Sequence, residues 1–268
     1  MTHCRYILMV LMLLAFLPVR SQSMYGYNYT TGVDATKWIT LTNPSPIRTF
    51  NSSDLFSPVV ELDFSFGFFG ARVHSVSVSK TGMIACNRAY DNLVPTQISL
   101  SHLSQTYPDP LIFVCGQTSD VEVRAVCQTV GTPGNRTWVC EVSQRRIENA
   151  ALESHYQFQI DESTSGMRFV YRNNIGLSAN GQLGFTGNYS RYINIAPNTH
   201  VASTGEISPN GPQSWPGNNR YYQFTPICGN AVNIRVSHVG YNSAKLSWSP
   251  FSGSDSCYIV RYGRPGSG

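Results

Sequence analysis

The chain has 268 residues and a formal net charge of +4, and its charged fraction of 13% is about half the share that is usual for a soluble domain. So small and scattered a positive charge argues against a nucleic-acid partner. The abundance of Tyr, Phe, Ser, Thr, Asn and Gly is typical of a secreted all-β protein, and the length suffices for one sizeable core and part of a second domain.

Residues 1–21 are predicted to be a secretory signal peptide. A short positive segment that ends at Arg5 precedes an apolar run over 7–17, and small residues then favour cleavage before Gln22. The alternative is an uncleaved membrane anchor, but the run is shorter than the ~20 residues that span a bilayer. We therefore expect no membrane span after cleavage. Two arginines leave with the leader, so the net charge falls to 4 − 2 = +2.

The mature chain is dominated by short segments in which apolar and polar residues alternate or form brief apolar runs, separated by turn residues. The predicted strands are 62–68, 73–78, 83–86, 111–114, 121–130, 137–142, 156–160, 167–171, 184–185 and 221–224. Helical spacing occurs only over 145–153. The pattern predicts an all-β fold, an antiparallel, jelly-roll-like β-sandwich over residues 23–226.

Six cysteines remain after the leader, with its Cys4, has been removed. An even number in an exported chain favours disulfides, although buried free thiols are the alternative. The turn at 133–134 predicts a hairpin in which opposite residues sum to 267, so Cys127 faces Cys140 because 127 + 140 = 267. By elimination Cys86 could pair with Cys115, and Cys228 with Cys257, but the sequence supports these two pairings less than the first.

Motifs that carry catalysis are weak. The segment 77–82 contains both S-x-x-K and K-T-G, but one lysine, Lys80, would have to serve both motifs, whereas penicillin-binding enzymes use two. Glu61 and Asp63 share a strand face, so a carboxylate pair for glycoside hydrolysis is conceivable. A solvated strand face is the simpler interpretation. We therefore expect a protein that is not an enzyme.

Candidate ligand sites are equally sparse. The histidines are scattered without metal-ligand spacing, and the absence of C-x-x-C gives no support to a zinc site, so no cofactor or metal is expected. Trp215, in the Gly- and Pro-rich segment 203–219, and Tyr221 could stack on a sugar or peptide ligand. Alternatively they close the ends of the sandwich. Four N-x-[ST] sequons would be glycosylation sites in a eukaryotic chain and uninformative in a bacterial one; they begin at Asn28, Asn51, Asn135 and Asn188.

Two resemblances follow from longer stretches. V-E-L-D-F-S-F-G-F-F-G, V-S-V-S-K-T-G-M-I and Y-Q-F-Q-I-D-E-S-T-S-G-M-R-F-V-Y are similar to a β-sandwich module found at the front of secreted bacterial surface proteins, over most of residues 24–226. That module brings no catalytic residues. Residues 228–268 resemble the opening strands of a fibronectin type III domain, with matching core positions at Leu246, Trp248, Tyr258, Val260 and Tyr262.

The second resemblance is incomplete, because 268 − 227 = 41 residues stand where a complete sandwich of this type needs about 100. It implies that the chain is the front of a longer protein or a truncated reading frame, and that 228–268 does not fold alone. The leading interpretation is a non-enzymatic secreted or cell-surface protein for adhesion, display or binding of an extracellular protein or glycan. The alternative is the non-catalytic N-terminal part of a larger exported hydrolase.

Overall fold

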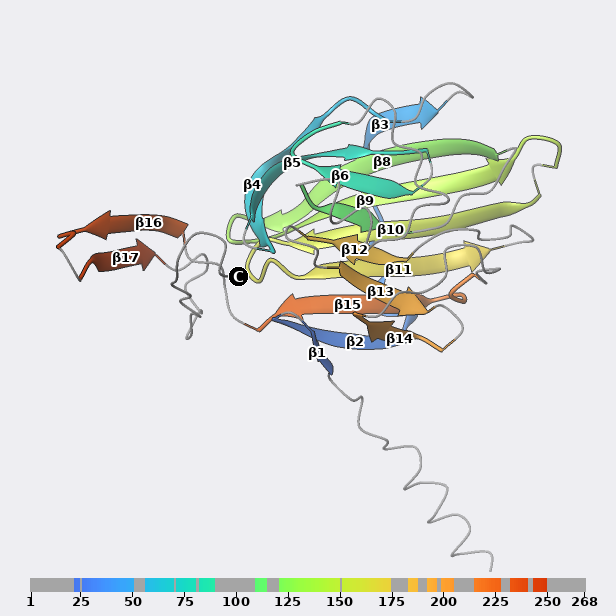
Figure 1. The fold of residues 1–268 in the computed structure, drawn as a ribbon. Helices are drawn as coiled ribbons and strands as arrows, with labels where there is room; N and C mark the ends of the chain where they lie inside the picture. Colours follow the sequence, from blue (N-terminus) through green and yellow to red (C-terminus); the bar gives the residue numbers. More distant parts are fainter. Residues whose placement is uncertain are drawn as a thin grey trace, which may run out of the picture.

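Two large antiparallel β-sheets pack face to face in the computed structural model, so the predicted β-sandwich is confirmed (Figure 1). A separate two-stranded sheet follows toward the C-terminus. The residues that the structure describes are 22–24, 26–50, 56–69, 71–80, 82–89, 109–114, 121–149, 151–174, 183–187, 192–196, 199–204, 215–227, 232–240 and 243–249. The predicted leader lies outside them.

The first sheet has eight strands, and neighbours in it are antiparallel throughout. From one edge to the other its strands are β1 (Gln22–Met24), β2 (Tyr27–Val33), β15 (Arg220–Pro226), β11 (Met167–Asn174), β10 (Glu153–Asp161), β9 (Asn135–Arg146), β8 (Val121–Thr132) and β3 (Ser45–Phe50). The hairpins β8–β9 and β10–β11 are those that the turn residues predict.

The second sheet has seven antiparallel strands. In spatial order they are β14 (Val201–Ser203), β13 (Tyr192–Ala196), β12 (Gly184–Thr186), β7 (Leu111–Phe113), β6 (Met83–Cys86), β5 (Ala71–Val78) and β4 (Val60–Phe68). Each predicted strand between 62 and 224 therefore corresponds to a strand of one of the two sheets. The strands β1, β2, β3, β13 and β14 were not predicted.

Aromatic rings fill the space between the sheets. The ring of Phe185 on β12 meets that of Phe224 on β15 at 4.8 Å between centroids and 87°, which joins the two layers edge to face. The hydroxyl of Tyr171 on β11 donates to the carbonyl of Val114, beside β7. Burying one such side chain contributes about 1.5–3 kcal/mol to the free energy of folding. The apolar contact between the two sheets therefore stabilises the sandwich.

The strands β6 and β7 are buried on both faces, which explains why their sequences do not alternate. Ile84 and Ile112 belong to the core between the sheets. The residues on the opposite face form a second buried cluster, packed against Phe56 and Tyr192; its members are Met83, Ala85, Leu111 and Phe113.

The edge strand β4 carries a wide bulge. Glu61 pairs with Ser75 and Phe66 pairs with Val73, so the four residues 62–65 stand opposite a single residue of β5. Beyond the bulge, the N–H of Gly67 donates to Oγ of Ser165 in the β10–β11 turn at 3.1 Å. A strand edge with unpaired amides invites pairing with another chain, and this contact ties part of that edge to the other sheet.

The helical spacing over 145–153 does not produce a helix. β9 continues to Arg146, a short turn follows, and β10 begins at Glu153. The N–H of Arg146 donates to the carbonyl of Leu152 at 2.9 Å, and the Leu152 side chain packs against the core. Pairing with neighbouring strands therefore overrides local helical preference in this short segment.

Candidate functional surfaces

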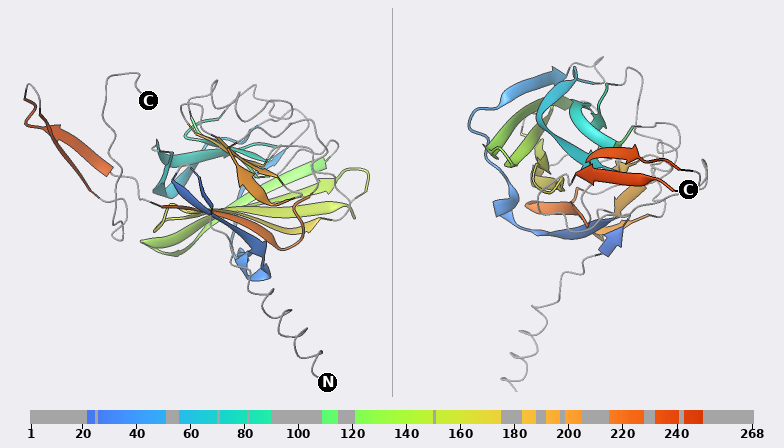
Figure 2. Two further views of the ribbon diagram at one scale, coloured as in Figure 1. Left: turned by 60° about the horizontal axis from the view of Figure 1, so that its bottom comes forward. Right: turned by 90° about the vertical axis from the view of Figure 1, so that its left-hand side faces the viewer.

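A strap crosses the outer face of the eight-stranded sheet. β2 and β3 lie near opposite edges of this sheet, so residues 34–44, here called the strap, must pass over the strands between them. The strap contains the single-turn 3-10 helix η1 (Ala35–Lys37), whose N-cap Asp34 accepts a hydrogen bond from the backbone N–H of Thr36. The right-hand view of Figure 2 shows this blue segment running along the outside of the sheet from β2 to β3.

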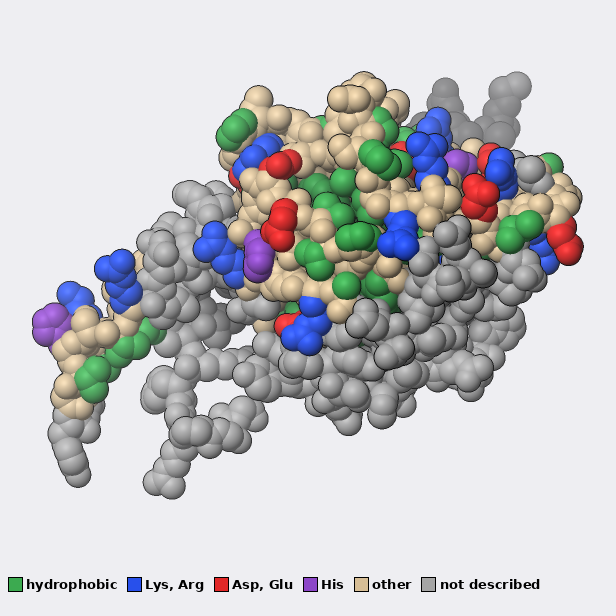
Figure 3. All heavy atoms as spheres, turned by 90° about the horizontal axis from the view of Figure 1, so that it is seen from above, with side chains coloured by type: hydrophobic (Ala, Val, Ile, Leu, Met, Phe, Trp, Pro, Cys, Tyr) green, Lys and Arg blue, Asp and Glu red, His purple; other side chains and the backbone are tan. Residues whose placement is uncertain are grey.

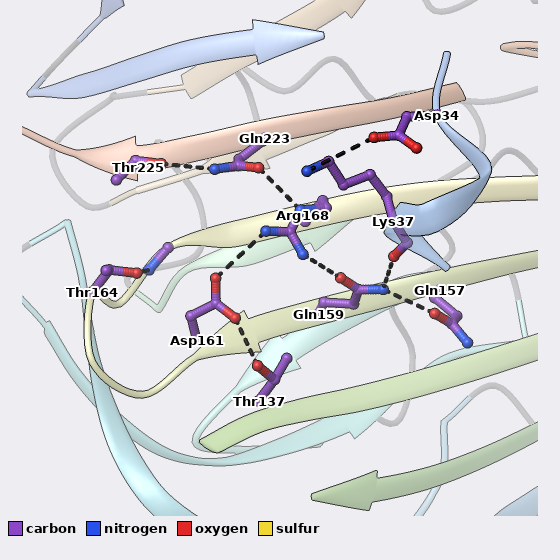
Figure 4. A network of polar contacts seen from close by, with 11 residues as sticks. Asp34, Lys37, Thr137, Gln157, Gln159, Asp161, Thr164, Arg168, Gln223 and Thr225 are labelled. Atoms are coloured by element: carbon purple, nitrogen blue, oxygen red, sulfur yellow. Dashed lines mark hydrogen bonds and ion pairs between the residues drawn. The ribbon is translucent and has the colours of Figure 1, made fainter. Parts of the chain in front are cut away.

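Glutamine side chains hold the strap. Oε1 of Gln157 on β10 accepts from the N–H of Ile39 at 3.1 Å, and its Nε2 donates to the carbonyl of the same residue at 2.7 Å. Nε2 of Gln159 donates to the carbonyl of Lys37 at 2.9 Å (Figure 4). Toward the far edge, Oε1 of Gln128 on β8 accepts from two further strap amides. The glutamines thus supply hydrogen bonds that a neighbouring strand would otherwise provide.

Arg168 on β11 stands at the centre of the polar network beside the strap (Figure 4). Its Nη1 donates to Oε1 of Gln159 at 2.6 Å, its Nε donates to Oε1 of Gln223 at 3.0 Å, and its Nη2 lies 3.7 Å from a carboxylate oxygen of Asp161. These partners come from both neighbouring strands, so the guanidinium links β10, β11 and β15 on the outer face of the sheet.

The two aromatic residues proposed for ligand stacking lie on opposite faces of the eight-stranded sheet. Trp215 packs against the core and meets Tyr171 edge to face at 5.2 Å. Tyr221 lies on the outer face, where Nζ of Lys37 stands 5.6 Å from its ring centroid and its ring covers Gly32. The two rings therefore do not form one platform, and each has a structural contact. Trp215 thus packs against the core, whereas Tyr221 covers the backbone of β2 on the outer face of the sheet.

Cys127 and Cys140 stand directly opposite one another in the β8–β9 hairpin, as the turn position predicts. Both are free thiols in this structure, both are buried, and burial raises the pKa of each. Cys86 is likewise a buried free thiol. Cys115, Cys228 and Cys257 lie outside the described residues, so the pairings proposed for them stay predictions.

We expect the exported chain to contain a Cys127–Cys140 disulfide. Opposite residues of an antiparallel pair have Cα atoms about 4.5–5.5 Å apart, within the range that a disulfide spans. Because the raised thiol pKa leaves little reactive thiolate in the folded protein, the bond should form before the sheets close. It should add up to about 3 kcal/mol to the free energy of unfolding. Peptide mapping without reduction should recover the linked peptides; free thiols at both positions would contradict this prediction.

The tip of the β8–β9 hairpin is fastened to the β10–β11 turn by one carboxylate. Oε2 of Glu162 accepts from the N–H of Gly134 at 2.8 Å and from Nε of Arg136 at 2.8 Å, while Oε1 accepts from Nη2 of Arg136 at 2.7 Å. The guanidinium also lies 5.3 Å from the ring centroid of Phe64 in the β4 bulge. We call this the Arg136–Glu162 clamp. Its hydrogen bonds lower the pKa of Glu162 from 4.5 to about 2.

The clamp predicts a pH-dependent contribution to stability. Because the folded-state pKa of Glu162 is depressed, the contribution is complete above the unfolded value of 4.5 and is lost as the pH falls toward about 2. Glu162→Gln should lower the free energy of unfolding by about 1–2 kcal/mol at neutral pH, and the deficit should shrink with acidification. Urea unfolding of both proteins across this pH range is the measurement. A constant deficit would contradict it, and Glu148→Gln, at an exposed carboxylate, is the control.

Where the structure describes them, the residues considered for chemistry do not assemble into a site. Among the described residues no group of three or more His, Cys, Asp and Glu could hold a metal ion. Ser77, of the S-x-x-K motif, is fully buried, and its hydroxyl donates to the carbonyl of Ser57 at 2.7 Å. Glu61 and Asp63 are exposed on β4, as a solvated face requires. His200 is half-buried, with Nδ1 2.8 Å from the hydroxyl of Tyr222.

A family model described as NIDO related matches residues 28–226, from within β2 to the last residue of β15. The chain belongs to the NIDO-related family. The NIDO-related domain is a β-rich domain of the extracellular type, and its span agrees with the module resemblance seen over most of residues 24–226. No curated protein and no solved structure matches the chain. In the described part of the chain no helix is long and apolar enough to cross a membrane.

Beyond the NIDO-related domain lies the two-stranded sheet of β16 (Val232–Ser237) and β17 (Lys245–Ser249). Figures 1 and 2 draw this hairpin apart from the sandwich. The family match does not reach it, and Tyr258, Val260 and Tyr262 lie outside the described residues. The fibronectin type III resemblance therefore stays a prediction.

The β16–β17 hairpin has one apolar and one basic face. Val236 pairs with Leu246, and Trp248 follows two residues later on the same side; these side chains are 60%, 39% and 37% exposed. The alternate positions on the other face include the exposed residues Arg235 and Lys245. Figure 3 shows basic and His side chains along one side of the hairpin and hydrophobic ones along the other. Residues 228–250 contain no Asp or Glu.

Proposed function

We propose that this chain is a secreted or cell-surface module without enzymatic activity, which binds an extracellular protein through the β16–β17 hairpin. The observation that carries the proposal is the exposure of Val236, Leu246 and Trp248 on one face of the hairpin. Leu246 and Trp248 are positions that the fibronectin type III resemblance would bury in a core, and in this proposal the partner protein covers them. Neighbouring exposed apolar side chains of this size are characteristic of contact surfaces between proteins. Aromatic residues among them are the side chains that most often dominate binding energy.

The NIDO-related domain serves in this proposal as the rigid support of the hairpin. The space between its sheets is filled by buried side chains, and the strap lies over the outer face of the eight-stranded sheet. Arg168, Gln157 and Tyr221 on that outer face are engaged in contacts within the chain. These contacts favour recognition at the hairpin over recognition on this face.

Charge indicates the kind of partner. Arg235, His238 and Lys245 are exposed on a hairpin segment that has no acidic residue. A partner with an apolar contact area and an acidic rim is therefore complementary, and its association should be faster at low ionic strength.

The test uses the full exported chain against a panel of immobilised extracellular-matrix proteins, with a glycan array in parallel. We expect binding to a protein with an acidic surface, weakened by salt and weakened at least about tenfold by the double substitution Val236→Ser, Leu246→Ser. The matched control is Ile147→Ser, which removes an apolar side chain that is 71% exposed in the β9–β10 turn. Binding to glycans alone, or protein binding that the double substitution leaves unchanged, would refute the proposed surface.

A further inference from the structure

Two of the four N-x-[ST] sequons lie among the described residues, and they differ in their surroundings. Asn135 is the first residue of β9, at the tip of the β8–β9 hairpin, and it follows the exposed residues 131–134. Asn28 lies inside the eight-stranded sheet, between its cross-strand neighbours Ser23 and Thr225. Asn51 and Asn188 fall outside the described residues.

The tip presents the Asn135 side chain as an acceptor. Asn135 is exposed, and within the described part of the chain its carboxamide has no hydrogen-bonding partner. The backbone around it is held by the Arg136–Glu162 clamp, in which Gly134 and Arg136 donate their N–H groups to the carboxylate at 2.8 and 3.1 Å. The folded tip therefore accommodates a group already attached to Nδ2, because Asn135 stays exposed after folding.

The rest of the sequon also suits this modification. Arg136 occupies the middle position, where proline would prevent modification. Thr137 lies two residues from Asn135 on the same side of the strand, and its hydroxyl donates to Oδ1 of Asp161 at 2.8 Å. Asp161 belongs to β10, so this is a cross-strand hydrogen bond. Thr137 therefore completes the sequon before folding and donates this hydrogen bond after folding.

We propose that Asn135 carries an N-linked glycan. The co-reactant is a lipid diphosphate-linked oligosaccharide in the secretory pathway. Nδ2 of Asn135 forms a bond to the anomeric carbon of the sugar, while the bond from that carbon to the diphosphate oxygen breaks and its electron pair leaves with the lipid diphosphate. One Nδ2 proton passes to a base of the transferase. The product is a bulky hydrophilic group on a surface turn, which shields residues 132–135 from partners and proteases.

The experiment uses the full chain, exported by eukaryotic secretory cells under its own leader, and reads the Asn135 peptide by mass spectrometry. We expect a glycopeptide before treatment with peptide-N-glycosidase and an aspartate at position 135 after it. Asn135→Gln and Thr137→Val should each abolish this glycopeptide. Thr137→Ser keeps the sequon and a hydroxyl for Asp161, so it should retain the glycan.

The outcome does not depend on the proposed binding surface. Asn28→Gln serves as the second control, because it removes the other described sequon and should leave the Asn135 glycopeptide intact. An exported wild-type chain in which the Asn135 peptide is unmodified would overturn the proposal, whatever the state of the other sequons. The mass spectrum of the wild-type Asn135 peptide decides this by itself, so the test remains valid even if a variant fails to fold.

Discussion

Gly184→Ala should destabilise the domain more than any other single methyl addition considered for this chain. Gly184 lies in β12, in the middle of the seven-stranded sheet, and has a φ of 142°, which residues with a side chain rarely adopt. A Cβ there would stand 2.0 Å from the carbonyl oxygen of Ile193 on β13. Because that atom belongs to the backbone of a paired strand, the two strands would have to separate. We expect a loss of at least about 3 kcal/mol in the free energy of unfolding.

Gly217→Ala separates the cost of the positive φ from the cost of the contact with the Ile193 carbonyl. Gly217 has a φ of 110°, but no atom lies within 4 Å of the position that its Cβ would take. This variant should therefore show the backbone cost alone, about 1–2 kcal/mol. Urea unfolding of the three proteins is the measurement. Equal losses in the two variants would show that the contact with Ile193 does not limit stability.

Gln157→Leu should release the strap from the eight-stranded sheet. Leucine keeps nearly the same volume, but the N–H and the carbonyl of Ile39 both lose their partner, and Glu141 loses a hydrogen bond of 2.9 Å from Nε2. Gln157 is fully buried, so water cannot replace these contacts without opening the strap. We expect a loss of about 2–3 kcal/mol in the free energy of unfolding and faster hydrogen exchange at the Ile39 amide.

Gln128→Leu is the matched control for the strap. Its Oε1 accepts from the amides of Thr42 and Asn43 at 3.0 Å, in an exposed position where water can take over. The expected loss is about 1 kcal/mol or less. Equal stability of Gln157→Leu and Gln128→Leu would show that contacts other than those of Gln157 hold the strap. Unchanged hydrogen exchange at the Ile39 amide in Gln157→Leu would show the same.

The sequence pattern predicted those parts of the sandwich that depend on a single local factor, which is either the burial of a strand face or the position of a turn. In 156–160 the residues Tyr156, Phe158 and Ile160 alternate with glutamines because a strand turns alternate side chains to the core. The turn at 133–134 predicted the register that places Cys127 opposite Cys140. The apolar runs 83–86 and 111–114 were recognised as strands, and their lack of alternation reflects burial on both faces.

The candidate sites were harder to predict, because their residues meet only in three dimensions. Gln157 and Gln159 have the pattern of solvent-facing residues, yet they are 0% and 1% exposed under a strap that lies about 120 positions earlier in the chain. Trp215 and Tyr221 are near in sequence but lie on opposite faces of one sheet. A run of polar strand residues indicates which face of the strand points away from the core. It contains no information on which other segment covers that face.

The sequence by itself determined the fold class, the strands with one buried face and the hairpin registers, because these depend on side-chain period and on turn residues a few positions apart. Only the tertiary structure decided the course of the strap, the β4 bulge with the contact of Gly67 beyond it to the other sheet, and the replacement of helical spacing at 145–153 by strand pairing. Each of these depends on hydrogen bonds and packing between segments far apart in the chain, and the local pattern contains no information on which distant partner will be present.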